Sequence, residues 1–161
     1  MITINFETGE KLDLPLASLA KSNLRGLDLH RVIFDGLDLT EADFTGSNLR
    51  NASFSCSLLN GVVLNGAALM NAKFIGAKMR RVNLLDAIAA YADFSGADLS
   101  MANLENADIG GASFVNSNLR DVNLNVRRID GAVFIGAIYN GGTIWPEGFI
   151  PKNFGAIRRP D

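Results

Sequence analysis

A large apolar side chain recurs at every fifth position between Leu24 and Phe134. Of the 23 positions in this register, 22 hold Leu, Phe, Ile or Met, and only Ala89 departs from the pattern. A helix is excluded, because five helical steps rotate successive large residues by about 140° around the axis. One straight strand is excluded as well, because an odd spacing places successive residues on opposite faces. The chain therefore has to turn a corner once in every five residues, always in the same sense, so that each large side chain points inward.

The residues around each large one fit this geometry. Two positions earlier the chain carries mostly Ala, Ser or Val, and this position shares the inward face because residues i and i+2 of an extended segment lie on one side. Two positions later it carries ten glycines and four asparagines. These residue types tolerate the positive φ that a tight corner requires.

The phenylalanines predict how many corners make one coil. They recur every 20 residues, at Phe34, Phe54, Phe74, Phe94, Phe114 and Phe134. Four five-residue sides per coil bring these rings into one column with a spacing of about 4.8 Å, the distance between neighbouring strands. We therefore expect a solenoid of square section with about six coils and almost no helix.

The repeats also resemble a known family. The segments ADFTG at 42–46, ADFSG at 92–96 and ADLS at 97–100 are similar to the A-(D/N)-L-x-x signature of pentapeptide-repeat proteins. The resemblance implies an all-β fold, the right-handed quadrilateral β-helix, whose handedness the spacing alone does not supply. It implies no common activity, because the family includes inhibitors and protectors of type II topoisomerases that imitate the charge of DNA, bacterial effectors, and many proteins of unknown role.

Both ends of the chain depart from the repeat. Because a stack of coils leaves apolar surface and unpaired strand edges at its tips, each end needs a cap. We assign residues 1–20 to an N-terminal cap, 21–138 to the repeat solenoid and 139–161 to a C-terminal capping segment, all within one domain. Ile2, Ile4 and Phe6 alternate with polar residues and predict a strand. Trp145, Phe149 and Phe154 are expected to cover the last coil, as a core plug rather than a ligand site.

Charge and composition argue against several functional classes. Fifteen basic and seventeen acidic residues give a net charge of -2, which favours neither a general nucleic-acid binder nor a polyanionic mimic. Residues 1–6 lack the features of a signal peptide, and no stretch has the length of a membrane span, so we expect a cytoplasmic protein. Cys56 is the only cysteine; an intrachain disulfide and a cysteine metal cluster are therefore excluded.

No catalytic constellation is visible, and we expect no cofactor, no metal and no enzymatic activity. His30, the only histidine, directly follows a core position and points to solvent, without a second base near it. Cys56 falls at a corner and is interpreted as a passive thiol. The serines at 22, 47, 57 and 117 fall at inward positions where they replace Ala in the packing.

Charged residues at outward positions are predicted to form ladders between coils. Adding 20 to each position pairs Lys73 with Asp93, Lys78 with Asp98, and Asp108 with Arg128, and aligns Asn83, Asn103 and Asn123. Opposite charges and amides on neighbouring strands stabilise a sheet. Arg80 and Arg81 have no partner by this count.

The segment 86–91 is irregular and leaves two interpretations open. Its core residue shrinks to Ala89, while Ile88 and Tyr91 are formally outward. Either Ile88 stays on the surface as part of an apolar patch, or the strand bulges and Ile88 fills the space that Ala89 leaves. With outward Met70 and Leu85 nearby, we expect a partner-binding surface formed by Met70, Leu85, Tyr91, Arg80 and Arg81.

The sequence thus favours a non-enzymatic protein-interaction or scaffold module, a rigid wall whose partner is another protein. The chain itself is expected to be a monomer, or a dimer through a capped end, without a membrane or nucleic-acid partner. The alternative is a DNA-mimic protein that binds a type II topoisomerase, which the net charge of -2 disfavours.

Overall fold

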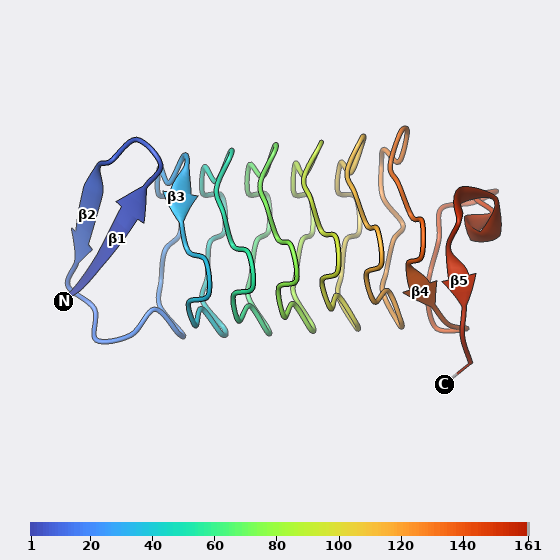
Figure 1. The fold of residues 1–161 in the computed structure, drawn as a ribbon, viewed down its shortest axis with the longest axis horizontal. Coiled ribbons are helices and arrows are strands. Elements are labelled where there is room, and N and C mark those ends of the chain that lie inside the picture. The colour runs from blue at the N-terminus through green and yellow to red at the C-terminus, as the bar shows by residue number, and fades with distance from the viewer. Residues whose placement is uncertain (161) are drawn as a thin grey trace.

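Parallel pairing at a fixed spacing of 20 residues builds the whole molecule. The computed structural model describes residues 1–160, and in it backbone bridges link Asn23 to Asp43, Asp43 to Val63, and so on from coil to coil (Figure 1). The Leu24 N–H donates to the Asp43 carbonyl at 2.8 Å, and the Asp43 N–H donates to the Ser22 carbonyl at 2.9 Å. The same two bonds repeat along the solenoid, and the predicted 20-residue period is confirmed.

Regular strands lie only near the two ends of residues 1–160. At the N-terminus, β1 (Ile2–Phe6) pairs antiparallel with β2 (Lys11–Leu14) and with β3 (Val32–Ile33), so this hairpin lies against the edge of the first coil (Figure 1). At the other end, β4 (Ile138–Tyr139) pairs in parallel with β5 (Ile157–Arg158). The strand predicted from Ile2 to Phe6 is confirmed. The described helical structure is the 3-10 turn η1 (Pro151–Phe154).

The core is a stack of rings flanked by aliphatic side chains. Phe54, Phe74 and Phe94 are fully buried, and each ring centroid lies 4.9 Å from the next with planes 4° apart. Phe94, Phe114 and Phe134 continue the column at 5.0 and 5.2 Å. This spacing equals the rise of one coil, so the rings stack face to face without disturbing the backbone hydrogen bonds.

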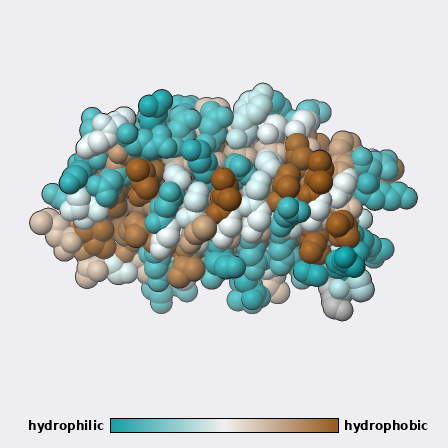
Figure 2. Space-filling model, viewed as in Figure 1, coloured by the Kyte–Doolittle hydropathy of each residue, from teal (hydrophilic) through white to brown (hydrophobic). Residues whose placement is uncertain are grey.

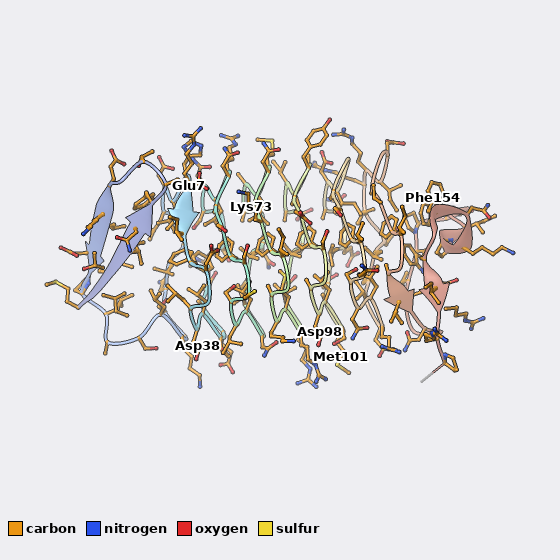
Figure 3. The ribbon with its side chains drawn as sticks, viewed as in Figure 1. Glu7, Asp38, Lys73, Asp98, Met101 and Phe154 are labelled. Carbon is orange, nitrogen blue, oxygen red and sulfur yellow. The ribbon has the colours of Figure 1, made fainter. Side chains whose placement is uncertain are left out.

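Aromatic side chains also close the C-terminal end. Trp145 and Phe149 approach the Phe134 ring edge-on, with centroids 5.2 and 5.6 Å away, as predicted for a plug. Phe154, labelled in Figure 3, stacks on Phe149 at 4.5 Å but stays 49% exposed. It forms the outer layer of the cap. Aromatic stacking therefore runs from the core to the outer surface of this end.

The corners have one conformation whatever residue occupies them. Gly36, Gly76 and Gly96 have φ near +67°, as expected, but Arg81 (φ 57°) and Tyr91 (φ 59°) adopt the same left-handed conformation. Such a φ costs a side chain with a Cβ about 1–2 kcal/mol. Hydrogen bonding to the neighbouring coils imposes the corner conformation, and residues other than glycine adopt it as well.

The irregular segment keeps the repeat register. Ile88 pairs with Ala68 and with Asp108 as an outward residue, and its N–H donates to the Ala67 carbonyl at 3.0 Å. Ala89 is buried, whereas Ile88 is half-buried on the wall. Of the two open interpretations, the surface position of Ile88 is the one found, and the strand does not bulge.

Replacing Phe74 by Ala should lower the free energy of unfolding by about 3–5 kcal/mol, because the two neighbouring rings hold the coils apart around the resulting cavity. Lys73→Ala, one residue earlier on the outer face, is the matched control and should cost little. Urea unfolding of the two variants measures the difference. Equal midpoints would contradict the inward and outward assignment.

Candidate functional site

Exposed side chains gather along four corner columns. The Tyr91 corner consists of residues 30–31, 50–51, 70–71, 90–91 and 110–111, and the Arg81 corner of residues 20–21, 40–41, 60–61, 80–81 and 100–101. The Leu85 corner contains 25–26, 45–46, 65–66, 85–86 and 105–106, and the Ile75 corner contains 35–36, 55–56, 75–76 and 95–96. The Tyr91 and Arg81 corners are half a coil, ten residues, apart, so they lie diagonally opposite each other in the square section. Met101, on the Arg81 corner, lies at the lower edge of Figure 3, and Lys73 lies on the wall facing the viewer.

The structure divides the five predicted partner-binding residues among three corners. Met70 and Tyr91 share one corner, Leu85 lies on the next, and Arg80 and Arg81 lie on the diagonal corner. The expected single surface of an apolar patch with these arginines at its rim is therefore wrong. Residues adjacent in sequence face different directions here, and the neighbours of a side chain lie 20 positions away.

Tyr91 is the most exposed large hydrophobic side chain of its corner. It is 62% exposed with a φ of 59°, and its ring lies along the next coil, where a Cβ on Gly111 would come within 2.5 Å of two ring carbons. Its hydroxyl makes no hydrogen bond to any group of residues 1–160. A large amphipathic ring is thus held outside the wall, over a glycine that leaves room for it.

The cationic residues of this corner are ones that the sequence analysis did not select. Counting back in steps of 20 along the Tyr91 corner leads from Met70 to Arg50 and from Tyr91 through Asn71 and Asn51 to Arg31. The Arg31 N–H donates to the Arg50 carbonyl at 3.0 Å, so the two lie on adjacent coils. Their cationic side chains are exposed. The 20-residue spacing in the sequence identifies Arg31 and Arg50 as residues of this corner.

A hollow of about 400 Å³ opens on the Arg81 corner. It is lined by Thr40, Glu41, Asn60, Gly61, Arg80 and Arg81. The hollow forms where Gly61 places no side chain between the coils that carry Glu41 and Arg81. A smaller hollow of about 210 Å³ lies near the N-terminal hairpin and contains His30 and Asp28.

The predicted charge ladders are only partly formed. Arg128 pairs with Asp108 at 3.3 Å. The backbones of Lys73 and Asp93, and of Lys78 and Asp98, do pair, but within residues 1–160 neither couple forms an ion pair. Asp98 instead accepts from the Asn118 amide at 3.1 Å. The asparagine ladder has one link, from Asn103 to Asn83 at 3.4 Å.

The residues considered for catalysis occupy structural positions. The Nε2 of His30 lies 3.1 Å from the amide nitrogen of Asn51 on the next coil. Cys56 is exposed at a corner. The inward serines donate to backbone carbonyls, as Ser57 does to Phe54 at 2.6 Å and Ser47 to Leu24 at 2.7 Å. Among residues 1–160, no three His, Cys, Asp or Glu side chains meet in a metal-binding arrangement. The same residues contain no helix with the length and apolar character needed to cross a bilayer.

Comparisons with known proteins identify the repeat. A family model described as pentapeptide repeats matches in eight copies, over residues 13–51, 47–86, 67–105 and 90–125. No curated protein matches the sequence. Together with the coil geometry, the structural matches described next identify the fold as the right-handed quadrilateral β-helix.

Three solved structures illustrate the similarity. A trypsin-treated form of QnrB1, a plasmid-mediated fluoroquinolone resistance protein, superposes with a TM-score of 0.67 at 23% identity, covering 78% of this chain and 65% of that one, just under two thirds. A second trypsin-treated form of QnrB1 gives 0.67 at 18% identity and covers 89% and 85%. A pentapeptide repeat protein from the thylakoid lumen of Arabidopsis thaliana gives 0.52 at 28% identity and covers 73% and 68%.

Two carboxyl groups on the walls have displaced pKa values. Partial burial alone raises the pKa of Asp43, but bonds from the Thr45 hydroxyl (2.5 Å) and N–H (2.9 Å) and from the Arg25 guanidinium (3.3 Å) together hold it below its usual value. Bonds from the hydroxyl and N–H of Thr40 likewise lower the pKa of Asp38. Both carboxylates are therefore stabilised in the ionised form by the corner that follows them.

Because folding lowers the pKa of Asp43, its contribution to stability is present above the unfolded pKa of about 3.9 and is lost as the pH falls through the folded pKa. Asp43→Asn should flatten the loss of stability below about pH 4, measured by urea unfolding at a series of pH values. Thr45→Val, which removes one donor, should flatten it in part. Unchanged pH dependence in both variants would show that these bonds do not favour the ionised carboxylate.

Proposed function

The chain belongs to the pentapeptide-repeat family, and from that premise we propose that it is a non-enzymatic interaction module that presents one corner of its solenoid to another protein. The proposed contact surface is the Tyr91 corner, with Tyr91 and Met70 at its centre and Arg31 and Arg50 beside them. A cytoplasmic location is part of the proposal. Proteins of this fold expose long walls of fixed geometry, and such walls suit recognition rather than chemistry.

The observation that carries the proposal is the state of Tyr91. Its ring is 62% exposed, and its hydroxyl makes no hydrogen bond within residues 1–160, although the ring lies over Gly111 on the next coil. The left-handed φ does not distinguish Tyr91, because the coil imposes it on twelve other non-glycine corner residues; the exposed ring does. A Tyr ring provides a large contact area and a hydroxyl that a partner can bond.

The residues around Tyr91 have the composition of an interface. Tyr, Met and Arg are enriched at protein-protein contacts, and this corner has all three on consecutive coils. The half-buried Met70 offers an adaptable apolar surface, and the guanidinium groups of Arg31 and Arg50 favour a partner with carboxylates at the edge of the contact.

Two other candidates are weaker. A DNA mimic that binds a type II topoisomerase would need rows of carboxylates, yet the wall columns that contain Lys73 and Lys78 have no two aspartates on consecutive coils. The likeness to QnrB1, at 23% identity, is one of fold. A second copy of the chain could instead meet the C-terminal end, where Ile150, Phe154 and Ile157 are exposed and brown apolar side chains gather in the view of Figure 2.

Changing Tyr91 and Met70 together to Ser should leave the thermal midpoint within a few degrees of the native protein, because neither is in the buried core, and should abolish capture of the native partner from the source cell. Affinity capture with mass spectrometry is the measurement. Met101→Ser with Leu58→Ser, two exposed apolar residues on other surfaces, is the matched control and should capture normally.

Capture that survives the Tyr91 and Met70 changes would place binding elsewhere and overturn the assignment of this corner. Recovery of a type II topoisomerase by the native protein and by both variants would favour the DNA-mimic alternative.

A further inference from the structure

The hollow on the Arg81 corner has donors on one side that no group of the protein uses. Arg80 and Arg81 are exposed, and within residues 1–160 neither side chain has a carboxylate within 4.0 Å or a hydrogen-bond acceptor. Both residues line the hollow of about 400 Å³. Guanidinium groups bind carboxylates through paired, charge-assisted hydrogen bonds.

The floor of the hollow adds a third donor and the space for a ligand. The Asn60 Oδ1 accepts the Arg80 backbone N–H at 3.0 Å, which fixes the amide and leaves its NH₂ group without an acceptor among residues 1–160. Gly61 occupies the position where the other corner residues of this column carry side chains. A Cβ there would meet the Glu41 Cγ at 3.3 Å, so the glycine keeps the floor open.

The opposite wall of the hollow is acidic. Glu41 lies one coil before Gly61, and Arg81 lies one coil after it, so their backbones are about 10 Å apart. The Lys21 ammonium lies 3.7 Å from the Glu41 carboxylate and neutralises it only in part, because both side chains are well exposed. The hollow therefore presents cations at one side and an acceptor at the other.

We propose that this hollow is a binding site for an acidic side chain of an extended peptide segment in a partner protein. The ligand carboxylate meets Arg80, Arg81 and the Asn60 amide, and a peptide N–H of the same segment meets Glu41. A phosphate group fits less well, because it offers only acceptors and brings a second negative charge toward Glu41. The inference rests on the proposed interaction function but uses a different corner from Tyr91.

Fluorescence anisotropy with a labelled Gly-Glu-Glu-Gly peptide, at low ionic strength, tests the site. The native protein should bind this peptide, and it should bind the isosteric Gly-Gln-Gln-Gly peptide about tenfold more weakly or not at all. Arg80→Gln with Arg81→Gln should weaken binding of the Glu peptide about tenfold. Arg158→Gln with Arg159→Gln removes the same charge from two consecutive exposed arginines outside both proposed surfaces and should have little effect.

Two glycine substitutions test whether peptide binding depends on the shape of the hollow as well as on its charge. Gly61→Ala fills the floor and should weaken binding, whereas Gly66→Ala has the same left-handed backbone (φ 67° and 63°) with open space around it and should bind normally. Thermal midpoints of the two variants control for the shared strain.

Several outcomes would overturn the site. They are absence of binding by the native protein, equal loss in the two arginine pairs, equal binding of the Gln peptide, and displacement of the peptide by inorganic phosphate at the same concentration as by free peptide. Partner capture that survives the Tyr91 and Met70 changes, together with binding of the Glu peptide that depends on Arg80 and Arg81, would overturn the proposed contact surface and leave this site standing.

Discussion

Parallel hydrogen bonding between residues one coil apart is the constraint on which every other feature depends. From Leu24 to Leu119 each large inward residue donates its N–H to the carbonyl 19 positions ahead, as Phe74 does to Asp93 at 2.7 Å. From Asp43 to Asn123 the outward residue just before each large one donates to the carbonyl 21 positions behind, as Asp93 does to Ala72 at 2.9 Å. These bonds hold the coil at 20 residues. The phenylalanine column, the left-handed corners and the alignment of surface residues all follow from that number.

The fixed coil length also determines what the surface can do. A side chain has neighbours at ±20 positions and shares no surface with residues half a coil away, so function is distributed along columns. The Tyr91 corner and the Arg81 corner are separate surfaces for this reason. The corner backbone is imposed on Arg81 and Tyr91 as on glycine.

Much of the fold could be predicted from the sequence, because the large apolar residue at every fifth position and the Phe at every twentieth position are the residues that form the core. The five-residue register, the stack of Phe54, Phe74 and Phe94, and the plug formed by Trp145 and Phe149 are all present. The handedness came only from the family resemblance. The left-handed conformation at corners without glycine or asparagine could not be read from composition, because the neighbouring coils impose it.

The surface could be predicted less well. Strand pairing aligned Lys73 with Asp93, but long side chains on an exposed wall are not held in contact, and their ion pair is absent. Arg80 and Arg81 were grouped with Met70 and Tyr91 because they are close in sequence, whereas the coil places them on the diagonal corner. The same step of 20 that located the phenylalanine column leads from Met70 to Arg50 on the preceding coil, and on to Arg31 one coil further.

The most direct test of the coil length compares two internal deletions. Removing residues 72–91 takes out one whole coil and should bring Phe54 against Phe94, whereas removing residues 72–86 preserves the five-residue register but places Ala89 against Phe54. The midpoint of urea unfolding, with circular dichroism as the signal, should be higher for the deletion of 20 residues than for the deletion of 15, although the former loses more core. A shorter deletion that is equally or more stable would contradict a four-sided coil as the basis of this fold.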